Sequence, residues 1–357
     1  MALSLSDEQK FVSRELLKFN KPIQTLGGYA GTGKSTVISH LMNILPNWKV
    51  CAFTGKAANV LRKKGVPATT IHSLIYKPLV DDKGDVIPDE NGNPTFVLTS
   101  ELDAEGIIID EASMISRELY EDLVSFNLPI IFVGDHGQLE PVGQDMNLMA
   151  HPDFTLETIH RNAGEVARFC EFIRRGYRPA AFQTSFEGKV HFLNRFQAEQ
   201  YITDVDQIIC AFNRTRVQIN KRVRAKLGMP EGDSPVVGDR IMCLKNNNQI
   251  GLFNGMQGTV DFIYSRKNRM HFRNDEGNVF DINFDPKQFN EEQYKLSFRR
   301  GDPDPFDFAY CITVHKSQGS EWNKLMVFEQ RGGNWDHRRW SYTAASRAED
   351  EIYWIVL

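Results

Sequence analysis

The sequence lacks the features that would assign it to a membrane, secreted or disulfide-stabilised class. None of its apolar runs approaches the roughly 18 consecutive residues that a membrane-spanning helix requires. Its N-terminus, MALSLSDE, contains neither the basic segment nor the long apolar segment of a secretion signal. Its five cysteines are scattered and form no Cys-x-x-Cys pair, which argues against a disulfide scaffold or a zinc site. We therefore expect a cytoplasmic protein that is not secreted and has no membrane partner.

The chain also lacks an excess of positive charge, internal repeats and linkers rich in serine, glycine or proline. Its 42 Lys and Arg residues against 46 Asp and Glu residues give a net charge of −4. This balance argues against a nucleic-acid binder that relies on bulk positive charge, although it leaves room for a local basic groove. Hydrophobic residues make up 41% and charged residues 25% of the 357 residues, which is ordinary globular usage. The length predicts about two to three domains.

Short apolar runs alternate with helical stretches over residues 1–150. Residues 23–26, 49–54, 107–109 and 130–133 are apolar, nearly continuous and rich in β-branched side chains. Such runs are typical of parallel strands that are buried on both faces and joined by crossover helices. The pattern predicts an α/β fold whose first domain is built on a parallel sheet.

Two segments interrupt this alternation. Residues 77–105 contain Asp-Lys-Gly-Asp and Glu-Asn-Gly-Asn, and turn residues of this kind between extended runs predict a β-hairpin insertion. Residues 231–305 contain short strands separated by turn residues, which predicts a small antiparallel β-barrel. Near the C-terminus, apolar runs like those of residues 1–150 return. We expect a second α/β domain over residues 151–357 that carries the barrel as an insertion.

A phosphate-binding motif directly follows the first apolar run. The segment from Gly28 to Ser35 reads Gly-Tyr-Ala-Gly-Thr-Gly-Lys-Ser and matches G-x-x-x-x-G-K-[ST] between a predicted strand and a predicted helix. Glycines allow backbone N–H groups to close around phosphate oxygens, and the helix N-terminus adds donors and its dipole. We expect Lys34 to reach the β- and γ-phosphates and the hydroxyl of Ser35 to hold Mg²⁺. The predicted nucleotide-binding residues of this motif are Gly28, Ala30, Gly31, Thr32, Gly33, Lys34, Ser35 and Thr36.

A pair of acidic residues ends the third apolar run. Asp110 and Glu111 follow three isoleucines, so their carboxylates are expected at the carboxyl end of a strand beside the phosphate loop. Asp110 would share the Mg²⁺ ion with Ser35, and Glu111 would position or activate the attacking water. Together with the phosphate loop, this pair predicts an enzyme that hydrolyses a nucleoside triphosphate.

Further motifs follow in order along almost the whole chain. They are Thr-Gly-Lys-Ala-Ala (54–58), Thr-Thr-Ile-His-Ser (69–73), Val-Gly-Asp-His-Gly-Gln-Leu-Glu-Pro-Val (133–142), Glu-Thr-Ile-His-Arg (157–161), Cys-Ala-Phe-Asn-Arg-Thr-Arg (210–216), Ile-Thr-Val-His-Lys-Ser-Gln-Gly-Ser-Glu (312–321) and Tyr-Thr-Ala-Ala-Ser-Arg (342–347). In this order and at this spacing, the set resembles the superfamily 1B DNA helicases, specifically their RecD-like and Dda-like branch of phage type.

The resemblance implies two RecA-like P-loop domains with ATP and Mg²⁺ bound between them and single-stranded DNA running across both. It implies an ATP hydrolase and DNA helicase that moves 5′→3′ on single-stranded DNA and acts at junctions of single-stranded and double-stranded DNA. An RNA helicase of the same superfamily and an ATP-gated nucleic-acid-binding module without unwinding are the alternatives. The resemblance also suits a monomer in a bacterial or phage-infected cell, with replication, recombination or repair proteins as candidate partners.

The resemblance assigns roles in the ATP site. Gln9 matches the glutamine that reads adenine, although it also fits a capping box at the start of a helix. Gln138 matches the sensor of the γ-phosphate, and Glu321 matches a residue near the ribose. Arg161 and Arg347 match the arginines that reach the transferred phosphoryl group, where a guanidinium stabilises developing charge. The expected catalytic residues are therefore Lys34, Asp110, Glu111, Gln138, Arg161 and Arg347.

Small hydroxyls, amides and cations in the remaining motifs suit contacts to DNA phosphates without base readout. The residues that match DNA contacts of the family are Thr54, Lys56, His72, Ser73, Asn213, Thr313, His315 and Lys316. The two histidines also fit turn or core positions. Phe96 is a candidate to stack against a base, or a residue that packs within the hairpin. The basic stretch 214–226, which includes Arg216 and no acidic residue, is either an electrostatic footprint for DNA or a solvated helix face.

Overall fold

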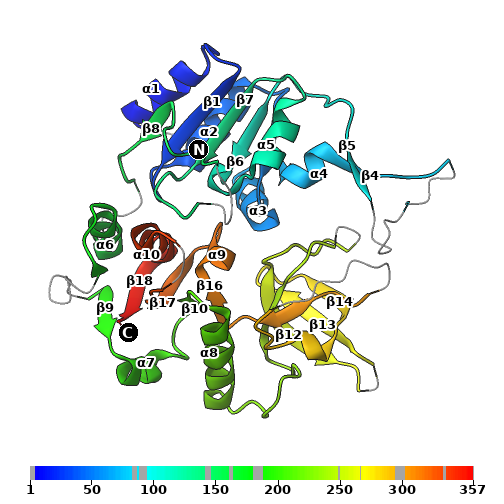
Figure 1. Cartoon of the computed structure of the whole chain (residues 1–357), viewed down its shortest axis with the longest axis vertical. Helices are drawn as coiled ribbons and strands as arrows, with labels where there is room; N and C mark the ends of the chain where they lie inside the picture. Colours follow the sequence, from blue (N-terminus) through cyan, green and yellow to red (C-terminus); the bar gives the residue numbers. More distant parts are fainter. Residues whose placement is uncertain are drawn as a thin grey trace. The chain divides into compact units, whose positions relative to one another are not determined.

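The computed structural model describes residues 5–82, 87, 95–140, 146–160, 164–179, 188–247, 250–265, 267–293, 302–332 and 335–356. Two compact units divide the chain, one made of Met1–Ile87 with Thr95–Ala163 and one that contains Gly164–Leu357. Figure 1 draws the first in blue to green and the second in green to red. The boundary expected after residue 150 is displaced, because strand β8 (Phe154–Leu156) pairs with β1 (Ile23–Gly28) in the first sheet.

The first unit is built on a six-stranded sheet in the order β3-β2-β6-β7-β1-β8. Its other strands are β2 (Lys49–Ala52), β3 (Ala68–Thr70), β6 (Ile107–Asp110) and β7 (Ile130–Gly134). Every neighbouring pair is parallel, which confirms the predicted architecture. Because the strands run the same way, their carboxyl ends meet at one edge of the sheet.

Helices cover both faces of this sheet. One apolar cluster joins Ile108 and Ile131 to α1 (Asp7–Leu16), α2 (Lys34–Ile44) and α3 (Gly55–Lys63). A second cluster joins Ile107, Ile109 and Phe132 to α4 (Ile71–Ile75), the 3₁₀ helix η1 (Ala112–Met114) and α5 (Arg117–Val124). Alternate residues of β6 and β7 therefore face opposite helical layers, as the period of a strand requires.

A two-stranded hairpin interrupts the first unit, as the turn residues predicted. Strand β4 (Tyr76–Pro78) pairs antiparallel with β5 (Phe96–Leu98). Backbone hydrogen bonds from Leu79 N–H to the Thr95 carbonyl and from Ile87 N–H to the Leu79 carbonyl, both 2.8 Å, continue the ladder. Residues 83–86 and 88–94 of the predicted insertion lie outside the described residues.

The second unit contains a five-stranded parallel sheet in the order β16-β10-β17-β18-β9. Its strands are β9 (Val190–Leu193), β10 (Gln207–Cys210), β16 (Cys311–Thr313), β17 (Trp322–Phe328) and β18 (Ala348–Ile355). An apolar cluster joins this sheet to α7 (Arg195–Tyr201) and α8 (Asn213–Lys226). Rings of α6 (Glu165–Arg174) and α10 (His337–Ala345) pack on Trp354 of β18. The short helix α9 (Val314–Ser317) directly follows β16.

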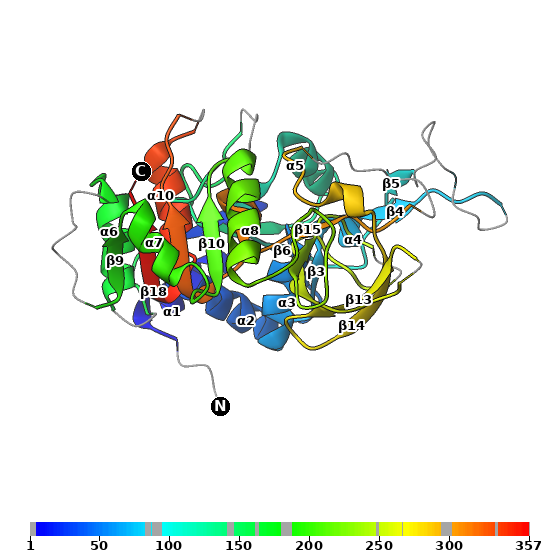
Figure 2. The same cartoon turned by 90° about the horizontal axis from the view of Figure 1, so that it is seen from below.

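An antiparallel sheet of five strands is inserted between α8 and β16, in the order β14-β13-β12-β11-β15. The strands are β11 (Arg240–Cys243), β12 (Gln257–Ile263), β13 (Arg269–Asn274), β14 (Val279–Asn283) and β15 (Phe306–Phe308), and the 3₁₀ helix η3 (Pro286–Gln288) follows β14. Figure 2 shows β13, β14 and β15 gathered beside α8. The expected end of the insertion at residue 305 is too early, because β15 pairs with β11. The insertion is an antiparallel sheet, as the turn residues predicted, and one 2.8 Å hydrogen bond joins Asp304 N–H to the Asn283 carbonyl, whereas its closure into a barrel stays a prediction.

Two further features of the structure concern the length of its apolar helices and the state of its cysteines. No helix within the described ranges is both long enough and apolar enough to cross a membrane. All five cysteines are buried and carry free thiols. Their positions on apolar strands and helices, such as Cys51 on β2 and Cys311 on β16, give them a packing role.

Candidate nucleotide and nucleic-acid sites

The phosphate loop connects the end of β1 at Gly28 to the start of α2 at Lys34. Gly31 and Gly33 adopt φ angles of 80° and 85°, a left-handed backbone that favours glycine. A Cβ atom on Gly33 would lie 2.3 Å from Nε2 of Gln9, and one on Gly28 would lie 2.7 Å from Oγ1 of Thr32. Both the backbone angles and the close approaches therefore require glycines where the motif predicted them.

Lys34 and Ser35 stand in the first turn of α2. The ammonium group of Lys34 donates hydrogen bonds to the carbonyls of Gly28 and Tyr29, at 2.8 and 3.0 Å. The hydroxyl of Ser35 has no partner among the described residues, and Thr36 N–H donates to the Gly33 carbonyl at 2.9 Å. The loop thus brings a cation and a free hydroxyl to the place where the motif predicts phosphates and Mg²⁺.

Gln9 connects α1 to the phosphate loop. Its Oε1 accepts a hydrogen bond from Ser6 N–H at 3.0 Å, and the Ser6 hydroxyl accepts one from Gln9 N–H at 3.2 Å, which confirms the capping box. Its Nε2 donates to the Thr32 carbonyl at 3.1 Å. The side chain is therefore held beside the loop by two contacts, and its contact to adenine stays a prediction.

Asp110 is the last residue of β6, and Glu111 follows it with a left-handed φ of 56°. The carboxylate of Asp110 accepts a hydrogen bond from Glu111 N–H at 3.0 Å. Burial raises the pKa of Asp110, and the nearby charge of Lys34 and the Glu111 N–H oppose that rise. The structure therefore brings Lys34 and Asp110 close enough to interact through their charges, as the two motifs predicted.

The segment after β7 supplies the third part of this edge. Asp135 accepts hydrogen bonds from Gly137 N–H at 2.9 Å and from Nε2 of Gln138 at 3.2 Å. Gln138 is buried. The strand that it follows, β7, lies between β6 and β1 in the sheet. Gln138 therefore follows the strand that neighbours both the phosphate loop and Asp110.

Sequence reasoning missed an aromatic contact between two of these loops. The rings of Tyr29 and His136 lie 4.2 Å apart, centroid to centroid. A Cβ atom on Gly27 would lie 2.9 Å from Nδ1 of His136, so the glycine makes room for the ring. Both aromatic residues occupy variable positions of their motifs, and only their ring character hinted that they meet.

Of the two arginines predicted for catalysis, the structure describes Arg347. Arg161 lies outside the described residues. Arg347 is buried in the second unit at the end of α10, where its guanidinium donates to the Thr343 carbonyl at 3.2 Å, the Ser320 carbonyl at 3.3 Å and the Ser346 hydroxyl at 3.0 Å. These bonds fix the guanidinium and use three of its five N–H donors. Glu321 is exposed and directly precedes β17.

The residues predicted to contact DNA in the first unit follow β2 and β3. The Thr54 hydroxyl accepts a hydrogen bond from Ala57 N–H at 3.1 Å and caps α3, whose first turn contains the half-buried Lys56. The Thr70 hydroxyl caps α4 and donates to the Ser73 hydroxyl at 2.8 Å, while His72 beside it is exposed. Because β2 and β3 are neighbours, both helix starts lie along the same edge of the sheet.

Phe96 belongs to neither apolar cluster of the first unit. It lies on β5 opposite Pro78, and 59% of its surface is exposed. Exposure argues against the alternative that its ring is buried by packing within the hairpin. A large exposed ring on a hairpin is available for stacking, and its contact to a base stays a prediction.

The DNA residues of the second unit follow two neighbouring strands. Asn213 begins α8 after β10. Thr313 ends β16, which pairs with β10, and His315 and Lys316 follow in α9. Burial lowers the pKa of both His315 and Lys316, and the charge of Arg216 lowers that of Lys316 further. The ammonium group of Lys316 reaches Oδ1 of Asn254 in the inserted sheet at 3.4 Å. The structure brings these four residues to one edge of the second sheet.

The expectation that Arg216 contacts DNA is wrong. Arg216 is 2% exposed, and its guanidinium is paired with the buried carboxylate of Asp307 on β15. It also donates to the Glu291 carbonyl and, through Nε, to Oδ1 of Asn213 at 3.2 Å. Its charge is therefore neutralised inside the unit and is unavailable to a phosphate.

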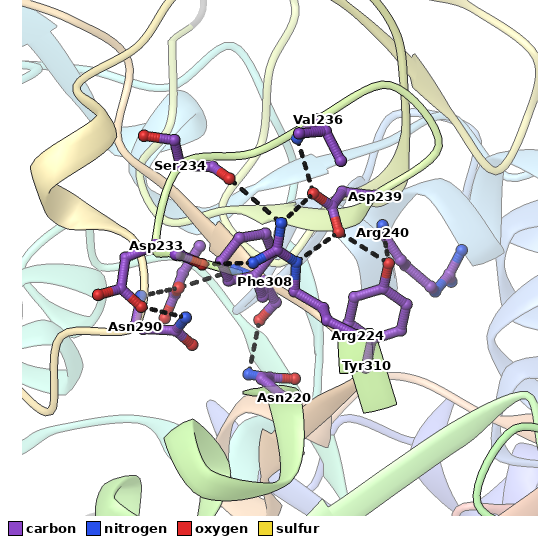
Figure 3. Close-up of polar contacts among 12 residues, drawn as sticks. Asn220, Arg224, Asp233, Ser234, Val236, Asp239, Arg240, Asn290, Phe308 and Tyr310 are labelled. Atoms are coloured by element: carbon purple, nitrogen blue, oxygen red, sulfur yellow. Dashed lines mark hydrogen bonds and ion pairs between the residues drawn. The ribbon is translucent and has the colours of Figure 1, made fainter. Parts of the chain in front are cut away.

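The same correction applies to part of the basic stretch 214–226. Arg224 is buried and forms a two-point contact with Asp239, with Nε–Oδ1 at 2.9 Å and Nη2–Oδ2 at 3.1 Å (Figure 3). Lys221 pairs with Asp233 at 3.1 Å, and Arg222 pairs with Glu199 at 2.5 Å, but both side chains are more than half exposed. Arg216 and Arg224 are therefore used inside the unit, whereas a DNA contact of the exposed cations stays a prediction.

Family models match both ends of the chain. The model of an AAA domain matches residues 4–195, and the model of a UvrD-like helicase C-terminal domain matches residues 308–355. The ATP-dependent DNA helicase Pif1 of Campylobacter jejuni is 24% identical, over 84% of this chain and 81% of its own. The ATP-dependent RecD2 DNA helicase of Deinococcus radiodurans is 24% identical, over 98% of this chain and 48% of its own. The chain thus spans most of the Pif1 relative and about half of the RecD2 relative.

Solved structures show the same fold. Bacteroides Pif1 bound to single-stranded DNA covers 98% of this chain and 92% of its own, with a TM-score of 0.64 and 20% identity. Bacteroides Pif1 in complex with ADP-AlF3 and single-stranded DNA gives a TM-score of 0.63 at 20% identity. These matches agree with an α/β fold of two RecA-like domains. Because the AAA-domain model matches more than half of the chain, the chain belongs to the AAA-domain family, and its homologues are superfamily 1B helicases of the Pif1 and RecD2 kind.

Proposed function

We propose that this chain is an ATP-dependent DNA helicase that moves 5′→3′ along single-stranded DNA and unwinds the duplex ahead of it. One observation carries the proposal: the phosphate loop, Asp110 and Gln138 follow three neighbouring strands at the carboxyl edge of the first sheet. Relatives that bear the names of DNA helicases support this activity. The direction of movement rests on the resemblance to this branch of helicases.

In the proposed reaction, water attacks the γ-phosphorus of ATP in line with the leaving oxygen and gives ADP and phosphate. Lys34, which now contacts the Gly28 and Tyr29 carbonyls, would exchange these for oxygens of the β- and γ-phosphates. Glu111 would orient the attacking water or accept its proton, and Gln138 would contact the γ-phosphate. Arg347 and Arg161, the two arginines that match the family's motifs, would stabilise the charge that develops on the transferred group.

Residues of this site fit a Mg²⁺ ion that is held mainly by phosphate and water. Mg²⁺ usually takes only one or two protein ligands at such sites. The free hydroxyl of Ser35 and the carboxylate of Asp110 are the two candidates, and a cation would stabilise the ionised form that burial disfavours at Asp110. Among the described residues, no group of three or more His, Cys, Asp or Glu side chains is arranged to hold a metal on its own.

Hydrolysis measured with and without polymers tests the proposal and separates it from the RNA alternative. We expect oligothymidylate to stimulate ATP hydrolysis strongly and oligouridylate to stimulate it weakly or not at all. Lys34→Ala should abolish hydrolysis and keep most of the salt-sensitive DNA binding. Equal stimulation by both polymers would favour an RNA helicase, and wild-type hydrolysis by the Lys34→Ala variant would refute the assignment of the ATP site.

An ATP-gated binding module is the second candidate, because it would need the same nucleotide site. It differs in predicting that ATP changes the affinity for DNA while no strands separate. The predicted hairpin, which presents Phe96 to solvent, is the feature that favours unwinding. A variant that lacks residues 78–103, and Phe96 with them, and still separates strands normally would remove that argument.

A further inference from the structure

A pocket of about 280 Å³ lies within the second unit. Its walls come from the end of α6, the segment after β17 and the first turns of α10, and Figure 1 shows α6 and α10 side by side. Its lining combines cations with aromatic rings: Tyr177, Arg178, Arg331, Trp335, His337 and Arg338. None of these residues belongs to the motifs that identified the family.

The three arginines that line this pocket differ in whether a carboxylate is paired with them. Arg331 donates to Oε1 of Glu329 at 3.2 Å, whereas the exposed guanidinium groups of Arg178 and Arg338 have no partner within the described ranges. Asp336, between the lining residues Trp335 and His337, accepts the N–H groups of residues 338 and 339 through Oδ1 and caps α10. No ion pair joins the guanidinium of Arg178 or Arg338 to a carboxylate among the described residues.

Glu329 holds two residues of the pocket lining, Arg331 and His337, by hydrogen bonds. Its buried carboxylate accepts hydrogen bonds from Nε2 of His337 at 2.8 Å and from Nε1 of Trp354 at 2.8 Å, besides the bond from Arg331. Burial alone would raise the pKa of Glu329, but these hydrogen bonds outweigh burial and lower it. Arg331 and His337 are thus held in place by an ionised group, and the pocket is preformed.

The aromatic rings of the pocket are partly exposed. Tyr177 is 53% exposed, and its ring stands edge-on to Phe172 with centroids 6.1 Å apart. Trp335 packs against Phe212, with centroids 5.3 Å apart. Phe212 directly precedes Asn213, a predicted DNA contact at the carboxyl end of β10. The contact between Trp335 and Phe212 therefore links one wall of the pocket to the segment that carries this predicted DNA contact.

We propose that this pocket binds one nucleotide of single-stranded DNA, as an extension of the predicted DNA path. Arg178 and Arg338 would bind phosphates, and the ring of Tyr177 or Trp335 would stack on the base. The volume lies near the lower end of pockets for small ligands, about 300 Å³, so it suits a single nucleotide and excludes a duplex. Rings beside cations favour a nucleotide over an acidic peptide, which would need the cations alone. The inference rests on the proposed function, because it extends the same DNA-binding surface.

The test measures the affinity for a fluorescent oligothymidylate over a range of salt concentrations. The variant Arg178→Ala with Arg338→Ala should bind about tenfold more weakly, and the slope of log K against log salt should fall by about 1.4, since each lost phosphate contact contributes about 0.7. The control variant Arg195→Ala with Lys267→Ala removes the same charge from exposed positions of the second unit. It should keep the wild-type slope, and both variants should keep the hydrolysis rate measured without DNA.

Trp335 supplies an independent test of stacking. Trp335→Ala should weaken binding by about tenfold without changing the salt slope, because stacking releases no counterions, and Trp335→Phe should retain most of the affinity. Wild-type affinity and slope in the double arginine variant would overturn the inference. If the double arginine variant keeps its affinity for oligothymidylate but loses binding to a polyglutamate peptide, the pocket would belong to an acidic protein segment instead. Absence of oligothymidylate binding by the wild type would refute the proposed function itself, which distinguishes the two failures.

Discussion

At the scale of single residues, Asp110 carries a charge that the fold alone does not stabilise. Burial raises its pKa, and Lys34 and the Glu111 N–H only partly offset this effect. The folded, ligand-free protein therefore keeps a proton on Asp110 at pH values where the unfolded chain has lost it. Ionising this carboxyl costs stability as the pH rises from the unfolded pKa of about 3.9 to the higher folded pKa.

Replacing Asp110 by asparagine separates the effect of its charge on stability from its proposed role in ATP hydrolysis. Asp110→Asn keeps an acceptor for the Glu111 N–H but removes the charge. We expect ATP hydrolysis to fall by about a hundredfold or more, because the proposed Mg²⁺ ligand is lost. The Tm without nucleotide should equal or exceed that of the wild type, with a difference that grows as the pH rises above the unfolded pKa of about 3.9. A variant that is less stable than the wild type at the higher pH would contradict the assigned cause of the pKa shift.

The guanidinium of Arg347 is fixed by hydrogen bonds to Thr343, Ser346 and Ser320, and its proposed role is in the reaction. Arg347→Ala should lower kcat by about 10³-fold and change the affinity for ATP much less, because the guanidinium acts on charge that develops in the transition state. Steady-state hydrolysis gives both quantities. Ser346→Ala removes one of its hydrogen-bond partners without removing the charge and serves as the matched control. A loss confined to ATP affinity, with kcat unchanged, would argue against the proposed role of Arg347.

At the scale of elements, the polar network of Figure 3 attaches the inserted sheet to α8. Arg224 of α8 contacts the carboxylate of Asp239, and the same carboxylate accepts hydrogen bonds from Val236 N–H at 2.7 Å and the Tyr310 hydroxyl at 2.9 Å. The guanidinium also lies 4.3 Å from the centroid of the Phe308 ring. Because every charged group here is paired, removing one partner leaves the other buried and uncompensated.

Arg224→Met should therefore destabilise the protein by about 3–5 kcal/mol in urea unfolding. Lys221→Met on the same helix breaks only the exposed contact with Asp233 and should cost less than about 1 kcal/mol. Combining Arg224→Met with Asp239→Asn should cost less than the sum of the two single changes, since the isolated charge is then gone. Similar losses for Arg224→Met and Lys221→Met would show that the buried contact does not hold the inserted sheet in place.

The hairpin is an element whose effect should appear in unwinding alone. Phe96 is largely exposed, so Phe96→Ala should change the free energy of unfolding by less than about 0.5 kcal/mol. It should leave DNA-stimulated ATP hydrolysis intact and lower the number of base pairs separated per ATP. Val97→Ala changes the neighbouring position, whose side chain points to the opposite face of the strand, and should have no such effect. Equal unwinding by both variants would leave Phe96 without a role at the junction.

At the scale of the whole molecule, the sequence predicted what strand direction determines. Motif residues that follow strands, such as Lys34, Asp110 and Gln138, were expected together because parallel strands place their carboxyl ends at one edge, and the structure groups them there. The hairpin and the inserted antiparallel sheet were also predicted, from their turn residues. The boundaries were wrong at residues 150 and 305 because the edge strands β8 and β15 are short and carry weak patterns.

Arg216 shows why the rest could not be predicted. On α8 the buried residues are Arg216, Ile219, Asn220, Val223 and Arg224, which follow the spacing of one helical face. That face contains two arginines, so its residue types indicate a solvated surface although the structure buries it. The acid that neutralises Arg216 is Asp307, 91 positions along the chain, and no local pattern connects the two. Local motifs predicted the nucleotide site, whereas these long-range ion pairs required the structure.

The most direct measurement is ATP-dependent strand separation on two DNA duplexes, one with a 5′ single-stranded tail and one with a 3′ tail. The account predicts unwinding from the 5′ tail alone, with Lys34→Ala inactive on both substrates. Unwinding from the 3′ tail alone would contradict the proposed direction while keeping the helicase. Failure on both duplexes, despite hydrolysis that DNA stimulates, would contradict the central claim and favour an ATP-gated binding module.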